Sequence, residues 1–267
     1  MSHEDDQQEL VKRVVVALDA SECSKAVLRT AARISAALNA ELEGLFVEDV
    51  RLLTLADLPI TAEVQFFGQV RPLDRTVMER DLRTLAQQVE RWADEIVKTY
   101  ALTWQFHTER GEVAQALLRA AGEEDLLSLG RFGGPGRHHR RRLGSVARRV
   151  FDLRRAPLLL LHEEIRRGQP VIVTTSGAPE EIRLLLMAAR LAQAYESEIT
   201  VLVEKPEAER LVRRVLKDYP VRVVVRPLEP GPLRPQILAI HGGRGGALLA
   251  HRREPELADL DCAVILL

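Results

Sequence analysis

The segment Val14-Val15-Val16-Ala17-Leu18-Asp19-Ala20-Ser21 decides the fold that we expect for this chain. Its first five residues are apolar and rich in valine, which is typical of a strand buried on both faces. Small and polar residues then form a turn, and the next segment, 24–39, carries an apolar stripe with helical spacing. A buried strand, a short turn and an amphipathic helix together predict the first unit of an α/β sheet.

The same arrangement occurs a second time along the chain. Val171-Ile172-Val173-Thr174-Thr175 is another β-branched run, and Ser176-Gly177-Ala178 follows it as another turn of small residues. At one constant offset, Ala31–Ile34 then aligns with Ala188–Leu191, and the alignment continues without a gap to the end of the next strand. A gapless register over strand, turn and helix indicates an internal repeat.

Strands and helices alternate through the first copy. We expect strands at 13–18, 41–47, 103–108, 125–129 and 156–161, and helices at 24–39, 75–100, 113–121 and 145–153. Residues 50–73 contain prolines and show no clear period, so we expect a long loop there. The charged segment Glu163–Gln169 is expected to link two domains, at 11–163 and 169–267. This alternation predicts parallel strands with right-handed crossovers, and therefore two doubly wound open sheets of the α/β class.

Composition narrows the class of protein. The chain has 267 residues, of which 46% are hydrophobic, 29% charged and only 4% aromatic, so we expect an aliphatic core. A net charge of -1 points to no class of partner. Cys23 and Cys262 form no metal or redox motif, and the acidic, polar N-terminus does not resemble a signal peptide. Because no apolar run is long enough to cross a membrane, we expect a cytoplasmic protein without membrane contact.

The loop after the fourth strand carries the strongest candidate site. Ligands of doubly wound sheets bind beyond the carboxyl ends of the strands. Here Leu129-Gly130 ends the strand, Gly133 lies in a glycine- and arginine-rich loop, and Gly144-Ser145-Val146 begins the next helix. Glycines let backbone N–H groups approach an anion, and a helix N-terminus favours negative charge. The alternative is that Ser145 is simply a helix cap.

Two further turns reach the same edge of the sheet. Asp19 follows the first strand, where its carboxylate could accept hydrogen bonds from ribose hydroxyls or help to hold a metal ion on phosphates. The alternative is that Asp19 or Ser21 caps the following helix. The second strand ends in Phe46-Val47, whose apolar side chains could lie against a base.

These segments resemble the universal stress protein family, in its ATP-binding branch. The resemblance rests on the valine-rich strand ending in Asp19, on Phe46-Val47, on Gly111-Glu112-Val113 before a short helix, and on Asp125–Gly130. The family's nucleotide signature is Gly, two residues, Gly, nine residues, Gly, then Ser or Thr. In this chain ten residues separate Gly133 from Gly144, so the loop is one residue longer than the signature.

The resemblance implies the strand order 3-2-1-4-5 and an ATP site, with or without Mg²⁺, in the first domain. Binding in this family is regulatory more often than catalytic. Because the sequence shows no fixed general base and no Walker-type lysine, we assign no catalytic residue, and we assign no protein metal site. Ala17, Leu18 and Asp19 would contact the adenosine end, and Val47 would lie near adenine. The ribose and phosphates would be surrounded by Leu129, Gly130, Gly133, Gly144, Ser145 and Val146.

The second copy lacks the features that this site requires. Ser176 stands at the position of Asp19, and His251 stands at the position of Gly130. The stretch between His251 and the last strand is too short for the glycine-rich loop. We therefore expect a degenerate second domain that packs against the first as an internal pseudo-dimer partner. Gly242–Gly246 precede a strand and not a helix, so we expect a connection there rather than a ligand loop.

Other functions stay open at this point. The cluster Arg137–Arg142 could cover ATP phosphates, could be a solvated loop, or could bind nucleic acid or another polyanion, in that order of preference. Asp19 with Mg²⁺ could support slow ATP hydrolysis or phosphotransfer. The chain could also be an interaction scaffold that binds no nucleotide. The identity of a protein partner, and whether two chains pair as a homodimer, are not fixed by the sequence.

Overall fold

The computed structural model describes residues 10–58, 74–131, 143–161, 163–242, 245–251, 256–257, 260 and 262–267, and the backbone of 62–64 and 70–72. The elements of the first half are β1 (Arg13–Leu18), α1 (Glu22–Leu38), β2 (Glu41–Asp49), α2 (Val50–Ala56), β3 (Ala62–Val64), β4 (Val70–Pro72), α3 (Arg75–Val97), β5 (Trp104–Gly111), α4 (Val113–Ala120), β6 (Asp125–Gly130), α5 (Ser145–Leu153) and β7 (Leu158–Leu161). Those of the second half are β8 (Val171–Thr175), a 3₁₀ turn (Pro179–Glu181), α6 (Ile182–Ala194), β9 (Ile199–Val203), α7 (Ala208–Leu216), β10 (Val223–Pro227), α8 (Leu233–His241), β11 (Ala247–Ala250) and β12 (Ala263–Leu266).

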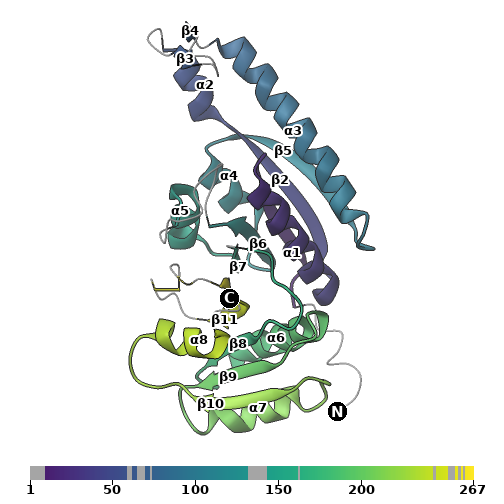
Figure 1. Cartoon of the computed structure of the whole chain (residues 1–267), viewed down its shortest axis with the longest axis vertical. Coiled ribbons are helices and arrows are strands. Elements are labelled where there is room, and N and C mark those ends of the chain that lie inside the picture. Colours follow the sequence, from purple (N-terminus) through teal and green to yellow (C-terminus); the bar gives the residue numbers. More distant parts are fainter. Residues whose placement is uncertain are drawn as a thin grey trace.

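Ten of these strands form one continuous sheet, in the order β10-β9-β8-β11-β12-β7-β6-β1-β2-β5 (Figure 1). All neighbours within each half are parallel, and each half has the expected order 3-2-1-4-5. The predicted α/β class is thus confirmed, and the two expected sheets are joined edge to edge. The junction is the antiparallel pair β7–β12, in which Leu159 lies opposite Ile265.

Helices cover both faces of this sheet. Residues of α1, α3, α6 and α7 pack into one apolar cluster, and residues of α4, α5 and α8 pack into the other. All four residues of β7 are buried, because the strand has neighbours on both edges and apolar clusters on both faces. Across the halves, Arg183 of α6 donates from Nε to the Leu10 carbonyl at 2.5 Å, and Ile165 donates its N–H to Thr30 Oγ1 at 3.4 Å.

The segment after β2 differs from the expected long loop. Val50–Ala56 is helical, and two three-residue strands, β3 and β4, pair farther on. The helix begins where it does because the Asp49 carboxylate accepts the Arg51 N–H at 3.0 Å, a side-chain cap. Only Leu53 and Ala56 are buried, and seven residues are too few to show a helical period in the sequence.

The longest described helix is amphipathic. α3 has 23 residues, and its buried side chains, Leu82, Ala86, Val89, Ala93 and Val97, recur at three- and four-residue spacing. Among the described residues, no helix has both the length and the apolar character that crossing a membrane requires.

The junction between the halves makes a direct prediction about stability. Leu159 has 0% exposure, whereas Leu153 at the end of α5 is 57% exposed. We expect Leu159→Ala to lower the free energy of unfolding by about 2–5 kcal/mol, because it leaves a cavity between packed layers. The control Leu153→Ala should change it by no more than about 0.5 kcal/mol. Urea denaturation followed by circular dichroism measures both, and equal effects would contradict the buried junction.

Candidate ligand-binding site

A cavity of about 400 Å³ lies in the first half, where β1, β2 and β6 end. Its size is within the range of small-molecule sites. Nine of the ten predicted site residues line it: Ala17, Leu18, Asp19, Val47, Leu129, Gly130, Gly144, Ser145 and Val146. The tenth, Gly133, and the Arg137–Arg142 cluster lie outside the described residues. The structure therefore brings together three turns that are far apart in the sequence.

The turn after β1 is held by the Asp19 carboxylate. Asp19 Oδ1 accepts the Ser21 N–H at 2.9 Å, the Ser24 hydroxyl at 2.6 Å and the Ser21 hydroxyl. Ser21 is the N-cap of α1, because its Oγ accepts the Ser24 N–H at 3.2 Å. The capping alternative is thus confirmed for Ser21. Among the described residues, every hydrogen bond that the Asp19 carboxylate accepts ends on Oδ1. Oδ2 is therefore left for another partner.

The helix after the glycine-rich loop begins without a side-chain cap. Gly144 is the N-cap of α5, and Ser145 is its first helical residue, so the alternative that Ser145 caps the helix is wrong. The N–H of Gly144 donates to the Arg131 carbonyl at 2.8 Å, which holds the two ends of the loop together. Glycine has no side chain with which to satisfy the next N–H groups, and the helix dipole makes this end positive. An anion can therefore bind here.

Apolar side chains form a wall on another side of the cavity. Phe46 and Val47 come from β2, Leu52 from α2, and Leu82 and Leu85 from α3. Leu52 is 39% exposed and Leu85 is 36% exposed, so part of this apolar surface faces solvent. Such a wall suits a flat, weakly polar ring such as a base. The α2 leucine was not found from the sequence, because the helix was expected to be a loop.

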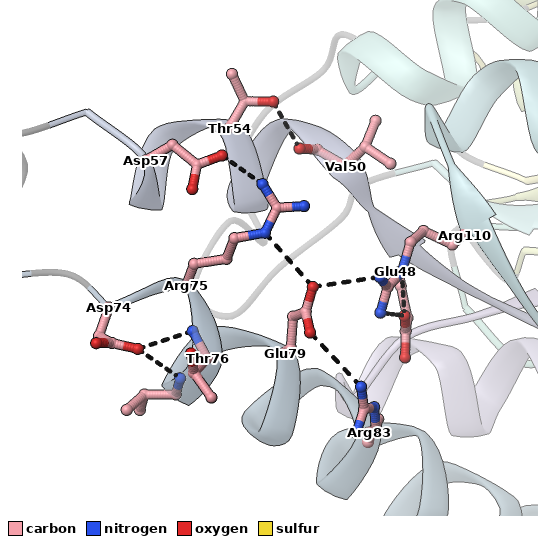
Figure 2. A network of polar contacts seen from close by, with 11 residues as sticks. Glu48, Val50, Thr54, Asp57, Asp74, Arg75, Thr76, Glu79, Arg83 and Arg110 are labelled. Carbon is pink, nitrogen blue, oxygen red and sulfur yellow. Dashed lines mark hydrogen bonds and ion pairs between the residues drawn. The ribbon is translucent and has the colours of Figure 1, made fainter.

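Ion pairs tie this wall to the sheet (Figure 2). The buried carboxylate of Glu48 in β2 pairs with Arg110 of β5 at 2.8 Å, and Arg110 pairs with Glu79 of α3 at 3.3 Å. Arg75 extends the network from Glu79, at 3.5 Å, to Asp57 at the end of α2. The wall thus has a defined position relative to the carboxyl end of β2.

Cys23 places a thiol in the cavity beside Asp19. Burial raises the pKa of the Cys23 thiol, and the negative charge of Asp19 raises it further. The thiol is half-buried, whereas Cys262, the other cysteine, is buried in the second half. Cys23 is consequently protonated near neutral pH and reacts slowly, although reagents can reach it.

Comparison with known proteins identifies the family. The sequence model of the universal stress protein family matches residues 11–162. The chain belongs to this family. No curated protein matches the sequence. Among solved structures, a universal stress protein from Archaeoglobus fulgidus DSM 4304 is similar at 15% identity over 96% of this chain and 97% of that chain, with a TM-score of 0.69.

Two other solved universal stress proteins are similar. A putative one from Pseudomonas aeruginosa UCBPP-PA14 has 12% identity over 96% of this chain and 93% of that chain, with a TM-score of 0.55. One solved in complex with cAMP has 22% identity over 57% of this chain and 98% of that chain, with a TM-score of 0.40. The cAMP is a property of that protein. The two similarities with TM-scores of 0.69 and 0.55 support the fold of this chain.

The corresponding turn of the second half is filled from within this universal stress protein. Glu181 Oε2 accepts the Thr175 hydroxyl at 2.6 Å and the N–H groups of Ser176, Gly177 and Ala178 at 2.9, 3.1 and 3.3 Å. The side chain is 5% exposed. A carboxylate that belongs to the chain thus occupies the set of amides at the carboxyl end of β8.

The N-terminus of α7 closes the same turn from outside. Gly177 has a φ of +86°, and a Cβ at this position would lie 2.7 Å from the Cβ of Ala208. Glycine is required here both by the backbone conformation and by the close approach of the helix. The sequence showed Ser176 in place of Asp19, but it gave no sign that Glu181 fills the turn.

The occupied turn predicts a pH-dependent stability. Burial raises the pKa of Glu181, but hydrogen bonds from Thr175 and Ser176 outweigh it, so the pKa lies below its ordinary value. The ionised form therefore stabilises the fold above the unfolded-state pKa of about 4.3, and this contribution is lost as pH falls through the lower folded-state value. At neutral pH, Glu181→Gln should lower the free energy of unfolding by about 1–3 kcal/mol.

Urea denaturation at several pH values measures this effect. The difference between wild type and Glu181→Gln should shrink as pH falls below about 4. Glu180→Gln is the matched control, because Glu180 is the exposed neighbour, and it should show little difference at any pH. A difference that stays constant with pH would contradict the role of the ionised Glu181 carboxylate.

Proposed function

We propose that this universal stress protein is a regulatory protein that holds ATP, or another adenine nucleotide, in the first-half cavity. The observation that carries the proposal is the convergence of three features on one cavity. These are the uncapped N-terminus of α5, the turn held by Asp19 and the apolar wall. Together they offer amides for phosphate, a carboxylate for a ribose hydroxyl or a cation, and aliphatic side chains for a base.

Each predicted residue has a role in this proposal. Val47, with Leu52 and Leu85, would contact the base, and Ala17, Leu18 and Asp19 would contact the adenosine. The phosphates would lie against Gly130 and the amides of Gly144, Ser145 and Val146, and Leu129 would line the cavity beside Gly130. Gly133 keeps its predicted role in the loop, outside the described residues.

A magnesium ion would have one protein ligand in this arrangement. Asp19 Oδ2 fits that role, because the hydrogen bonds within the turn use Oδ1. Asp49, the other carboxylate of the cavity lining, already pairs with Arg51 at 2.7 Å. One carboxylate plus phosphate oxygens and water is a usual environment for Mg²⁺, which would neutralise phosphate charge beside Asp19.

We further propose that the second half binds no nucleotide and serves as the structural partner of the first. The support is the Glu181 carboxylate, which fills the turn after β8 that corresponds to the Asp19 turn, and the packing of Ala208 against Gly177. The proposed domains, 11–163 and 169–267, would then have different roles. Each chain would hold one nucleotide, and a change in occupancy would be passed to a protein partner in a stress response.

Titration calorimetry tests the binding directly. ATP, ADP, AMP and cAMP are titrated into the full-length chain, and we expect a stoichiometry of one for the adenine nucleotide that binds. Gly144→Trp should weaken binding by about 100-fold, because its indole would occupy the phosphate position at the start of α5. Ala101→Trp adds the same indole on the exposed segment after α3 and should bind as the wild type does.

Three outcomes separate the candidate functions. Heat from none of the four nucleotides, or unchanged binding by Gly144→Trp, would contradict the proposal. Release of phosphate from bound ATP that is lost in Asp19→Asn, with binding retained, would favour a slow ATPase. Binding without turnover would favour the regulatory function.

The native cysteines offer a second measurement. We expect a bound nucleotide to protect Cys23 from alkylation by iodoacetamide, because the thiol lines the cavity. Labelling of the free protein should speed up from neutral to alkaline pH, since the raised pKa keeps the thiol protonated. Buried Cys262 is the internal control in mass spectrometry of the labelled peptides. Equal labelling of Cys23 with and without a nucleotide that binds would place the ligand elsewhere.

A further inference from the structure

Arg131 connects the candidate site to the second half of the chain. It follows Gly130 directly and lines the cavity. Its side chain crosses the junction between the halves, and one terminal guanidinium nitrogen donates to the Leu257 carbonyl at 3.1 Å. Leu257 lies between β11 and β12, so a residue of the proposed phosphate loop is bonded to a backbone group that is 126 positions away.

The backbone of Arg131 holds the two ends of the same loop. Its N–H donates to the Leu161 carbonyl at 2.8 Å, which extends the β6–β7 pairing. Its carbonyl accepts the Gly144 N–H at 2.8 Å, at the start of α5. A shift of Gly130 or Gly144 around a phosphate must therefore move Arg131 or break one of these bonds.

Burial makes the contact between the halves costly to break. Arg131 is 3% exposed and Leu257 is 1% exposed. A buried guanidinium requires hydrogen-bond acceptors, and a buried carbonyl that loses its donor is left without solvent. Movement of the loop is thus linked energetically to movement of Leu257, because water cannot reach the contact to replace the hydrogen bond.

The contact continues from Leu257 to a helix of the second half. The adjacent residue, Glu256, accepts the N–H of Leu233 at 2.9 Å, and Leu233 is the first residue of α8. The helix has Pro232 as its N-cap, without a side-chain cap hydrogen bond, so Glu256 supplies a partner that the local sequence does not. One path of hydrogen bonds therefore runs from the loop through Arg131, Leu257 and Glu256 to α8.

We propose that Arg131 is a positioning residue that couples ligand binding in the first half to the order of residues 256–257 and the N-terminus of α8. This inference rests on the proposed nucleotide site and assigns a regulatory role to the second half. A nucleotide that fixes the loop reduces the motion of Arg131, and the reduction passes to the Leu257 carbonyl and to the first turn of α8. The coupling is reciprocal, so loss of the Leu257 contact weakens nucleotide binding.

Hydrogen exchange of the full-length chain, with and without saturating ATP, tests the coupling. In the wild type, ATP should slow exchange at the cavity amides of 17–24 and 144–148, and also at the N-terminus of α8. Arg131→Met should keep protection at the cavity and lose it at α8, and its ATP affinity should fall by about fivefold or more. Arg149→Met is the control, because Arg149 pairs with Glu112 within the first half at 3.1 Å.

Glu256→Gln provides a second variant if Arg131→Met does not fold. It weakens the last link alone, so ATP should still protect the cavity while its effect on α8 falls. Protection of the wild-type cavity without any change at α8, or protection of α8 that persists in both variants, would overturn the coupling. Absence of protection at the cavity itself would instead overturn the nucleotide site, so the two failures are distinguishable.

Discussion

Backbone N–H groups at the carboxyl ends of parallel strands need an acceptor, and the two halves of this chain supply it differently. In the second half, Glu181 brings its carboxylate to three successive amides. In the first half, Asp19 satisfies the turn before α1, but α5 starts at a glycine that has no capping side chain. Both turns thus hold a carboxylate of the chain itself, whereas the N-terminus of α5 presents amides without a capping side chain.

The antiparallel pairing of β7 with β12 determines what lies near that site. Because the two strands run in opposite directions, the carboxyl end of the first half-sheet lies beside the segment that leads into β12. This arrangement brings Arg131 within hydrogen-bond distance of Leu257. A chain of two separate domains on a linker would have no such contact. The junction therefore places a residue of the second half, Leu257, in contact with a residue that lines the first-half cavity. This contact exists even though Glu181 fills the turn after β8.

The sequence predicted the parts of the fold that depend on local pattern. The valine-rich run of β1 and the four leucines of β7 are buried strands, and short continuous apolar runs are typical of strands that are covered on both faces. The resemblance supplied the strand order and a set of residues, nine of which line one cavity, although their role as ligand contacts is still a prediction. The length of the loop before Gly144 was noticed, but its geometry lies outside the described residues.

The features that were missed depend on tertiary neighbours. α2 has seven residues, and the Asp49 cap that starts it is visible only once β2 is known to end there. Glu181 belongs to an ordinary Pro-Glu-Glu stretch, and nothing local distinguishes it from exposed Glu180. Arg131 was assigned no role from the sequence, and only the folded sheet brings it beside Leu257. Contacts across 126 positions have no signature in a single sequence.

The two ways of satisfying the amides also differ in how they respond to the surroundings. An internal carboxylate is tethered to the turn that it fills, so its occupancy does not depend on any solute. Under the proposed function, occupancy of the first-half cavity would rise with nucleotide concentration, and a bound nucleotide would stabilise the fold by an amount that grows with the ratio of concentration to Kd. The first-half cavity would therefore report the nucleotide level, while the turn after β8 in the second half stays filled. Because β7 and β12 hold the halves in one sheet, a change at the first-half cavity would have a short path to the second half through Arg131 and Leu257.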